Sequence, residues 1–427
     1  MKNSGYRDIW ENTYPVLFAL LLEPAVSLVD SFVASRIGLL QLAGIGVGES
    51  IYAVLVWVFI FLAYGTTPLV SSLRAKEDYT NLIQLINYGR RLVFIFGFSS
   101  FVIIYFFSDY FISLFNPILQ VGEYADDYII PRSFGIVFYL YIMHSTAVLR
   151  GLRRASVALK TALIASFINV FLDFVFVFVF NMGVFGIGLA SAISFVITSV
   201  YVHFLLRKEV LLFGSSKNSD PVDIQKSFFS ISSSILIRSF FLMGMMTLMK
   251  NLASRVSYEA IALHHVLNHI WNLFSMLIDS VAIASQTLVA EKIANGGFYW
   301  KSKLSKQLLT ICVFMAISLY VISVFFIDDL VVILSNTEKL NSTVNNLRFV
   351  FAATLLVGCF AFLWDGILLG LGSFRHFSII TIAGSIAGAG LMLYSYNKFS
   401  SLYSLWFCLL ISLCIRTLLG FYYQTKK

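Results

Sequence analysis

Residues 157–206 read VALKTALIASFINVFLDFVFVFVFNMGVFGIGLASAISFVITSVYVHFLL. The stretch consists of two apolar runs, 157–181 and 184–206, separated by Asn181-Met182-Gly183. Each run is long enough to cross a hydrocarbon layer about 30 Å thick, because an α-helix rises about 1.5 Å per residue. Asn and Gly at the junction are typical of a turn. The stretch therefore predicts two transmembrane helices joined by a tight turn.

Runs of this kind recur along the whole chain and predict an all-α integral membrane protein of twelve transmembrane helices. Of the 427 residues, 59% are hydrophobic and only 12% are charged, too few charges to coat a soluble protein of this size. The runs lie near 14–35, 48–73, 92–113, 129–148, 157–181, 184–206, 229–250, 266–290, 306–327, 346–370, 377–396 and 400–424.

The basic residues are distributed unevenly over the predicted loops. The N-terminus, the loops after even-numbered helices and the C-terminal tail hold 21 of the 30 Lys and Arg residues. Positive residues stay on the cytoplasmic side, so both termini are expected in the cytoplasm. We expect the plasma membrane, the inner membrane in bacteria, with an organellar membrane as the alternative. Because the net charge of +8 comes from short loops, no nucleic-acid partner is expected.

The chain resembles itself at an offset of 219 residues. The matching segments include Ala34-Ser35-Arg36 with Ala253-Ser254-Arg255, and Gly151-Leu152 with Gly370-Leu371. This offset predicts two six-helix bundles, 1–208 and 227–427, joined by a cytoplasmic linker at 209–226. Because six helices return the chain to the same side, the halves should be related by a pseudo-two-fold axis along the membrane normal, with a cavity between them.

Two of the acidic residues inside predicted spans lie at similar depth, and each ionisable side chain within a span costs roughly 2.5–3.5 kcal/mol and needs a reason. Asp30 and Asp173 both fall in the outer half of the membrane, and Asn169 lies one turn before Asp173 on the same helix face. The three residues together predict a site for a proton or a small cation. The alternative is that each acid lies near a span end and bonds to solvent or backbone. The offset positions are Met249, Gly388 and Met392, so only the first half has the cluster.

Other polar residues within the spans are candidates for a substrate cavity: Glu23, Lys250, His264, Asp279 and Asp365. Pro15 and Pro24 each remove a backbone donor from the first helix and are expected to let it bend. His264, His265 and His269 have no Cys or acid at ligand spacing, so no metal site is expected. No nucleotide-binding or catalytic motif occurs, so we expect neither an enzyme nor a cofactor. Any transport would be driven by an ion gradient or would be passive.

Several motifs in order resemble the multidrug and toxic compound extrusion (MATE) family, specifically its DinF-like branch. They are Glu23-Pro24 leading to Val29-Asp30, Leu149-Arg150-Gly151, Asn169 with Asp173, the small residues Gly186 to Ser191, Ile278-Asp279 with Gln286, and Asp365-Gly366. Arg153-Arg154 departs from the Gly-Asp that is frequent after the Leu-Arg-Gly motif.

The resemblance implies cation-coupled antiport, with H⁺ or Na⁺ as the coupling ion and amphipathic organic compounds as the exported substrate. It implies alternating access between two bundles, an ion site at Asp30, Asn169 and Asp173, and cavity positions at Ser191 and Gln286. Pro15 stands where the family often has a proline linked to bending. The partners would be a small organic substrate, the coupling ion and the bilayer, with the chain a monomer. The alternatives are a lipid-linked oligosaccharide flippase of the same superfamily, an organic-anion exporter (favoured by Lys250), and a receptor or scaffold without transport.

Overall fold

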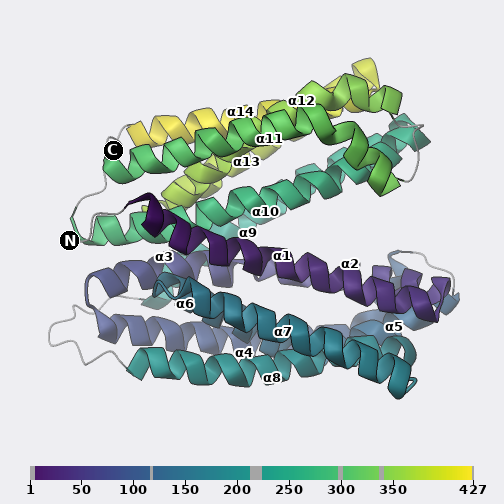
Figure 1. Cartoon of the computed structure of the whole chain (residues 1–427), viewed down its shortest axis with the longest axis horizontal. Coiled ribbons are helices and arrows are strands. Elements are labelled where there is room, and N and C mark those ends of the chain that lie inside the picture. Colours follow the sequence, from purple (N-terminus) through teal and green to yellow (C-terminus); the bar gives the residue numbers. More distant parts are fainter. Residues whose placement is uncertain (1–4, 116–118, 212–223, 297–301, 336–340, 426–427) are drawn as a thin grey trace. The chain divides into compact units, whose positions relative to one another are not determined.

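The computed structural model describes residues 5–115, 119–211, 224–296, 302–335 and 341–425, and these residues form helices without any strand (Figure 1). In chain order the elements are α1 (Tyr6–Ile37), α2 (Leu39–Val58), α3 (Phe61–Ala75), α4 (Tyr79–Ser113), α5 (Leu119–Phe134), α6 (Ile136–Gly151), α7 (Ala155–Phe174), the π-helical segment η1 (Val175–Val179), α8 (Gly183–Leu211), α9 (Ile224–Val256), α10 (Tyr258–Ala294), α11 (Lys303–Ser335), α12 (Asn341–Gly370), α13 (Phe374–Phe399) and α14 (Leu402–Thr425).

The described helices lie over the twelve predicted spans, but two of these spans are divided. Ten helices are long and apolar enough to cross a membrane singly. The predicted second span, 48–73, falls on the shorter helices α2 and α3. The predicted fourth span falls on α5 and α6, whose axes bend by 53° and which together could form an eleventh crossing. Pro131 lies in the last turn of α5, where its missing N–H weakens the helix ahead of the bend. The predicted turn is also confirmed, because Asn181 and Gly183 both have positive φ.

The chain folds as two compact units: Phe18–Ser232, here called the N-terminal unit, and Met1–Leu17 with Ser233–Lys427, here called the C-terminal unit. This division differs from the predicted boundary, because the first turns of α1 group with the second half of the chain. Ile9, only 1% exposed, belongs to the hydrophobic core that α9 to α14 build. Most of the predicted linker 209–226 lies outside the described residues.

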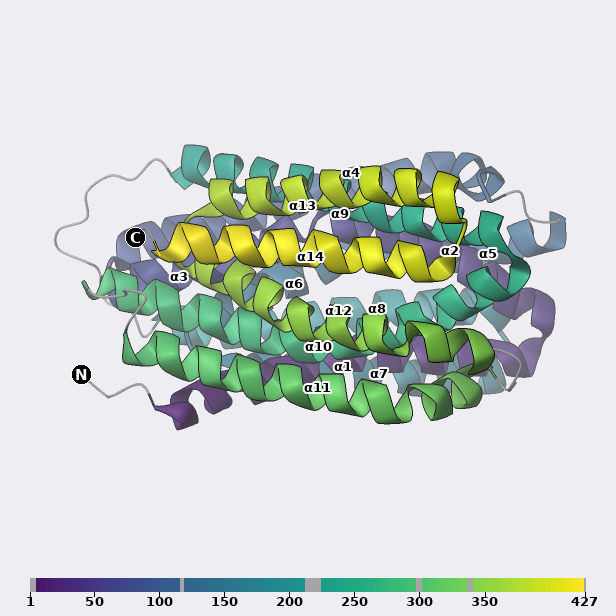
Figure 2. The ribbon, with the colours of Figure 1, turned by 90° about the horizontal axis from the view of Figure 1, so that it is seen from above.

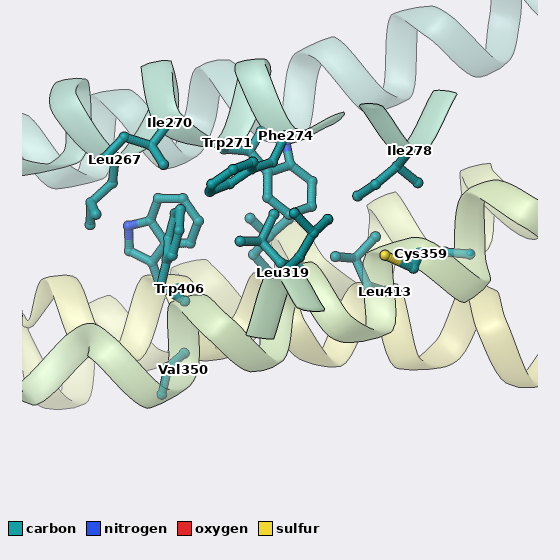
Figure 3. Close-up of a cluster of buried hydrophobic side chains, with 14 of the residues drawn as sticks. Leu267, Ile270, Trp271, Phe274, Ile278, Leu319, Val350, Cys359, Trp406 and Leu413 are labelled. Atoms are coloured by element: carbon teal, nitrogen blue, oxygen red, sulfur yellow. The ribbon is translucent and has the colours of Figure 1, made fainter. Parts of the chain in front are cut away.

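The core of the C-terminal unit is a cluster of large apolar side chains from α10, α11, α12 and α14 (Figure 3). Trp406 of α14 packs edge-on against Phe351 of α12, with ring centroids 5.1 Å apart. Trp271 and Phe274 of α10 lie in the same cluster. Helices α13 and α14 run side by side in this unit (Figure 2). Dense aromatic packing of this kind holds membrane helices together, because lipid supplies no hydrophobic force between them.

The two units repeat one helix contact at the predicted offset. A Cβ at Gly151 would lie 2.7 Å from the carbonyl oxygen of Thr67, and a Cβ at Gly370 would lie 2.8 Å from that of Gln286. Each pair is separated from its counterpart by 219 residues. Only Gly permits so close an approach between two helices, α3 with α6 in one unit and α10 with α12 in the other.

The chain also leaves these two helices in the same way. The amides of Leu152, Arg153 and Arg154 donate to the carbonyls of Val148, Arg150 and Leu149, and those of Leu371, Gly372 and Ser373 donate to Ile367, Leu369 and Leu368. Both turns place one residue at positive φ, Arg153 at 61° and Gly372 at 67°. The first unit therefore holds an arginine where the backbone favours glycine.

Candidate ion-binding site

Two buried carboxyl groups adjoin each other in the N-terminal unit. Asp30 of α1 is 1% exposed, and Asp173, in the last turn of α7, is fully buried. Each carboxyl group lies within electrostatic range of the other. A hydrogen bond shared by the two would require a proton on one of them, since an ionised carboxylate only accepts. Within the described part of the chain, no protein donor reaches Asp30 Oδ1 or either carboxyl oxygen of Asp173.

Asn169 extends this site along the same face of α7. Its side chain is buried, and Nδ2 donates to the hydroxyl of Ser191 on α8 over 3.1 Å. That bond orients the amide and leaves its Oδ1 without a donor among the described residues. The structure thus brings the predicted residues Asp30, Asn169, Asp173 and Ser191 into one region of one unit.

A guanidinium group that sequence reasoning missed lies beside the acids. Arg132 of α5 places Nη1 3.5 Å from Oδ2 of Asp30. Its Cζ atom lies 4.5 Å from the ring centroid of Tyr52 and 5.1 Å from that of Tyr128. The predicted fourth span, 129–148, begins close to Arg132. Because α5 begins at Leu119, Arg132 lies instead near the end of that helix.

Glu49 of α2 is the second missed residue. Oε1 of its carboxylate lies 3.9 Å from Nη1 of Arg132. The hydroxyl of Ser27 on α1 lies 2.9 and 3.0 Å from its two oxygens and donates to this group. The glutamate begins the predicted second span, a position that suggests a solvated end. It is instead only 27% exposed and shares Arg132 with Asp30.

The prolines and Glu23 belong to α1, which continues as one helix from Tyr6 to Ile37. Pro15 lies in the C-terminal unit and Pro24 in the N-terminal unit, so α1 passes from one unit to the other between them. The side chain of Glu23 lies outside the described residues.

Asp365 of α12 lies near the cytoplasmic end of its predicted span, a position that suggests either a solvated or a functional role. Its side chain is buried in the C-terminal unit. Its Oδ2 accepts from Nη2 of Arg416 on α14 at 2.5 Å and from Nη2 of Arg238 on α9 at 3.4 Å. Arg238 is held further by Thr381, whose hydroxyl accepts from Nε at 3.3 Å. Asp365 is therefore buried and paired with two arginines, which excludes the solvated alternative and leaves its functional role a prediction.

The other candidates of the second half lie on α9 and α10. Lys250 is exposed, and His264 is buried against Trp406, with ring centroids 5.9 Å apart. His265 and His269 are exposed and face each other with their Nε2 atoms 3.1 Å apart. Asp279 is half-buried and Gln286 is buried, both on α10. Across the described ranges, no three His, Cys, Asp or Glu side chains are placed to hold a metal ion.

Comparison with known proteins agrees with this architecture. The family model MatE matches twice, over residues 15–175 and 234–394, which repeats the predicted offset of 219 residues. The chain is 23% identical over 417 residues to "Protein DETOXIFICATION 45, chloroplastic" of Arabidopsis thaliana, covering 91% of this chain and 73% of that protein. It is 19% identical over 384 residues to "Multidrug resistance protein MdtK" of Yersinia pestis, covering 88% and 84%.

Among solved structures, "Crystal structure of MATE in the bent conformation" superposes with a TM-score of 0.88 at 16% identity, covering 98% of this chain and 94% of that one. The likeness shows that the fold is shared. The family match covers both halves, and the helices account for all twelve predicted spans. The chain therefore belongs to the MATE family of multi-pass membrane transporters.

Proposed function

We propose that the chain exports small organic compounds in exchange for a cation, and that the Asp30–Asp173 pair binds this cation. The family and its relatives support export, since MdtK is described as a multidrug resistance protein. We further propose that access alternates between the two membrane sides, that both termini face the cytoplasm, and that the chain works as a monomer in the plasma membrane, the inner membrane if the source is bacterial.

The observation that carries the cation site is an excess of buried acceptor oxygens. Asp30 Oδ1, both carboxyl oxygens of Asp173 and Asn169 Oδ1 have no donor within the described residues. Carboxylate and amide oxygens are the ligands of hard cations. Two carboxylates side by side in a water-poor environment repel each other unless a proton or cation is shared between them. Ion binding therefore satisfies groups that are otherwise costly to bury.

Coupling requires that the cation change the affinity for substrate. We infer that α1 transmits this change, because it carries Asp30 and also Pro15 and Pro24, each of which lacks the N–H that would complete a helical hydrogen bond. A helix with two such positions can have straight and bent forms that differ by only a few kcal/mol. A solved MATE structure of the same fold is described as bent.

The test is transport in proteoliposomes under an imposed H⁺ or Na⁺ gradient, with a fluorescent organic cation as substrate. Asp30→Asn and Asp173→Asn should each abolish gradient-driven transport. Asp328→Asn is the matched control, because it removes an acid of the C-terminal unit that pairs with Arg348. If all three variants transported like the wild type, the proposed ion site would be wrong.

A second candidate function, export of organic anions, is favoured by the cluster around Asp365. Two guanidinium groups, Arg238 and Arg416, both contact the carboxylate of Asp365, so these three side chains together carry one positive charge. Buried positive charge of this kind attracts carboxylates and phosphates. Parallel assays with a labelled tricarboxylate and with a cationic dye would separate the two functions, since each predicts transport of only one probe.

A further inference from the structure

Arg132 is placed where a cation bound to Asp30 would be. Its Nη1 atom is 3.5 Å from Asp30 Oδ2 and 3.9 Å from Glu49 Oε1, so two carboxylates face one guanidinium. The group also lies over the rings of Tyr52 and Tyr128. Two carboxylates and two aromatic rings thus hold the guanidinium in this position, since rings attract cations through their π-electron density.

We propose that Arg132 is a built-in counter-cation that excludes Na⁺ from the Asp30–Asp173 site and leaves the site to a proton. The inference rests on the proposed ion site and goes beyond it, because it names the coupling ion. It also assigns a specificity role to a residue outside the three positions that the family resemblance implies.

Like charge accounts for the exclusion. A Na⁺ ion bound to the free oxygen of Asp30 would lie about 4 Å from the guanidinium. Two unit charges at that separation, in a protein interior with an effective dielectric constant of about 20, weaken binding roughly 10²- to 10³-fold. Arg132 is covalently part of α5 and cannot leave, so Na⁺ must always bind against this repulsion.

A proton is not excluded in this way. It joins one carboxyl oxygen by a covalent bond and needs no shell of ligands, and it turns that carboxylate into a donor for its neighbour. Arg132 contacts Oδ2 of Asp30, whereas Asp30 Oδ1 and both oxygens of Asp173 remain without a donor among the residues described. The proton can therefore be shared between Asp30 and Asp173 while the ion pair persists.

Glu49 keeps Arg132 in place through the cycle. When a proton neutralises Asp30, that side chain no longer holds the guanidinium by charge. Oε1 of Glu49 lies 3.9 Å from the same Nη1 atom and so remains within ion-pair distance. Ser27 donates to Glu49, and the rings of Tyr52 and Tyr128 lie beside Arg132; none of these three side chains is a cation. The guanidinium thus blocks the position in both protonation states.

The experiment is equilibrium binding of ²²Na⁺ to the purified full-length protein at about pH 8, where protons compete least. The wild type should show no saturable binding at millimolar Na⁺. Arg132→Gln, which removes the charge, should bind Na⁺ roughly 10²- to 10³-fold more tightly, whereas Arg132→Lys should behave like the wild type. Adding Asp30→Asn to Arg132→Gln should abolish the gained binding. Arg154→Gln is the matched control, because it breaks a surface pair with Glu209 in the same unit and should change nothing.

Saturable Na⁺ binding by the wild type that Asp30→Asn removes would overturn the inference. So would folded Arg132→Gln protein that gains no Na⁺ affinity. If Arg132→Gln does not fold, Arg132→Met supplies a second uncharged variant, and the wild-type measurement decides independently of both. Binding needs no transport, so gained Na⁺ binding in a protein that exports nothing would support the inference and refute only the proposed function.

Discussion

Replacing Asp365 by Asn should destabilise the C-terminal unit far more than it impairs ion coupling. The variant removes the one carboxylate between Arg416, 2.5 Å away, and Arg238, 3.4 Å away, in a buried environment. Breaking a buried ion pair from one side costs about 3–5 kcal/mol, because a charge is left without its partner. For a unit of this size the loss corresponds to a drop in unfolding temperature on the order of 10 °C.

The assay is thermal unfolding of the purified protein, followed by intrinsic tryptophan fluorescence, together with transport measured per folded molecule. Adding Arg416→Gln to Asp365→Asn removes the orphaned charge and should restore about half of the lost stability, a coupling that a double-mutant cycle detects. Transport per folded molecule should remain higher than in Asp30→Asn. A loss of less than about 1 kcal/mol would refute the structural role, and transport lower than in Asp30→Asn would move the ion site to the C-terminal unit.

Three further predictions concern the turn after α6, the topology and the pH dependence. Arg153→Gly should be about 1 kcal/mol more stable than Arg153→Ala in thermal unfolding, because both lose the side chain and only Gly is relaxed at φ 61°; equal stabilities would contradict this. A cysteine at Ser215 should be protected from an impermeant external reagent, and a cysteine at Thr343 should react with it; both side chains lie outside the described part. The reverse pattern would invert the topology. Substrate affinity should fall as pH drops from about 8 to about 5, and Asp30→Asn should remove that dependence, since a proton on Asp30 or Asp173 opposes substrate binding in an antiporter.

The sequence was sufficient for the spans, the repeat and part of the site, because those depend on local patterns. Hydrophobic run length predicts helices, and the four-residue spacing of Asn169 and Asp173 predicts a shared face. The ion pairs were not predictable in this way. Asp365 meets its partners over sequence separations of 127 and 51 residues, so no local pattern joins them. Arg132 was missed because the span around it is two helices, and its position depends on where α5 begins.

The two units share a scaffold but not its charges. The contacts of Gly151 and Gly370 keep the 219-residue register in three dimensions. At that register the charged residues of each unit have uncharged counterparts in the other: Asp30 with Met249, Glu49 with Asn268, Arg132 with Phe351, Asp173 with Met392, Ala19 with Arg238, Thr146 with Asp365, and Ile197 with Arg416. Since one half of the fold does without each buried charge, none of these charges is required to form the helices. In the N-terminal unit, the acids Asp30, Glu49 and Asp173 lie around one base, Arg132. In the C-terminal unit, the bases Arg238 and Arg416 pair with one acid, Asp365. A duplicated scaffold with opposite charge in its two units can bind a cation in one unit and stabilise an anionic group in the other. Replacing Asp30 by the residue at its counterpart position, Asp30→Met, should therefore remove cation binding while leaving the fold intact.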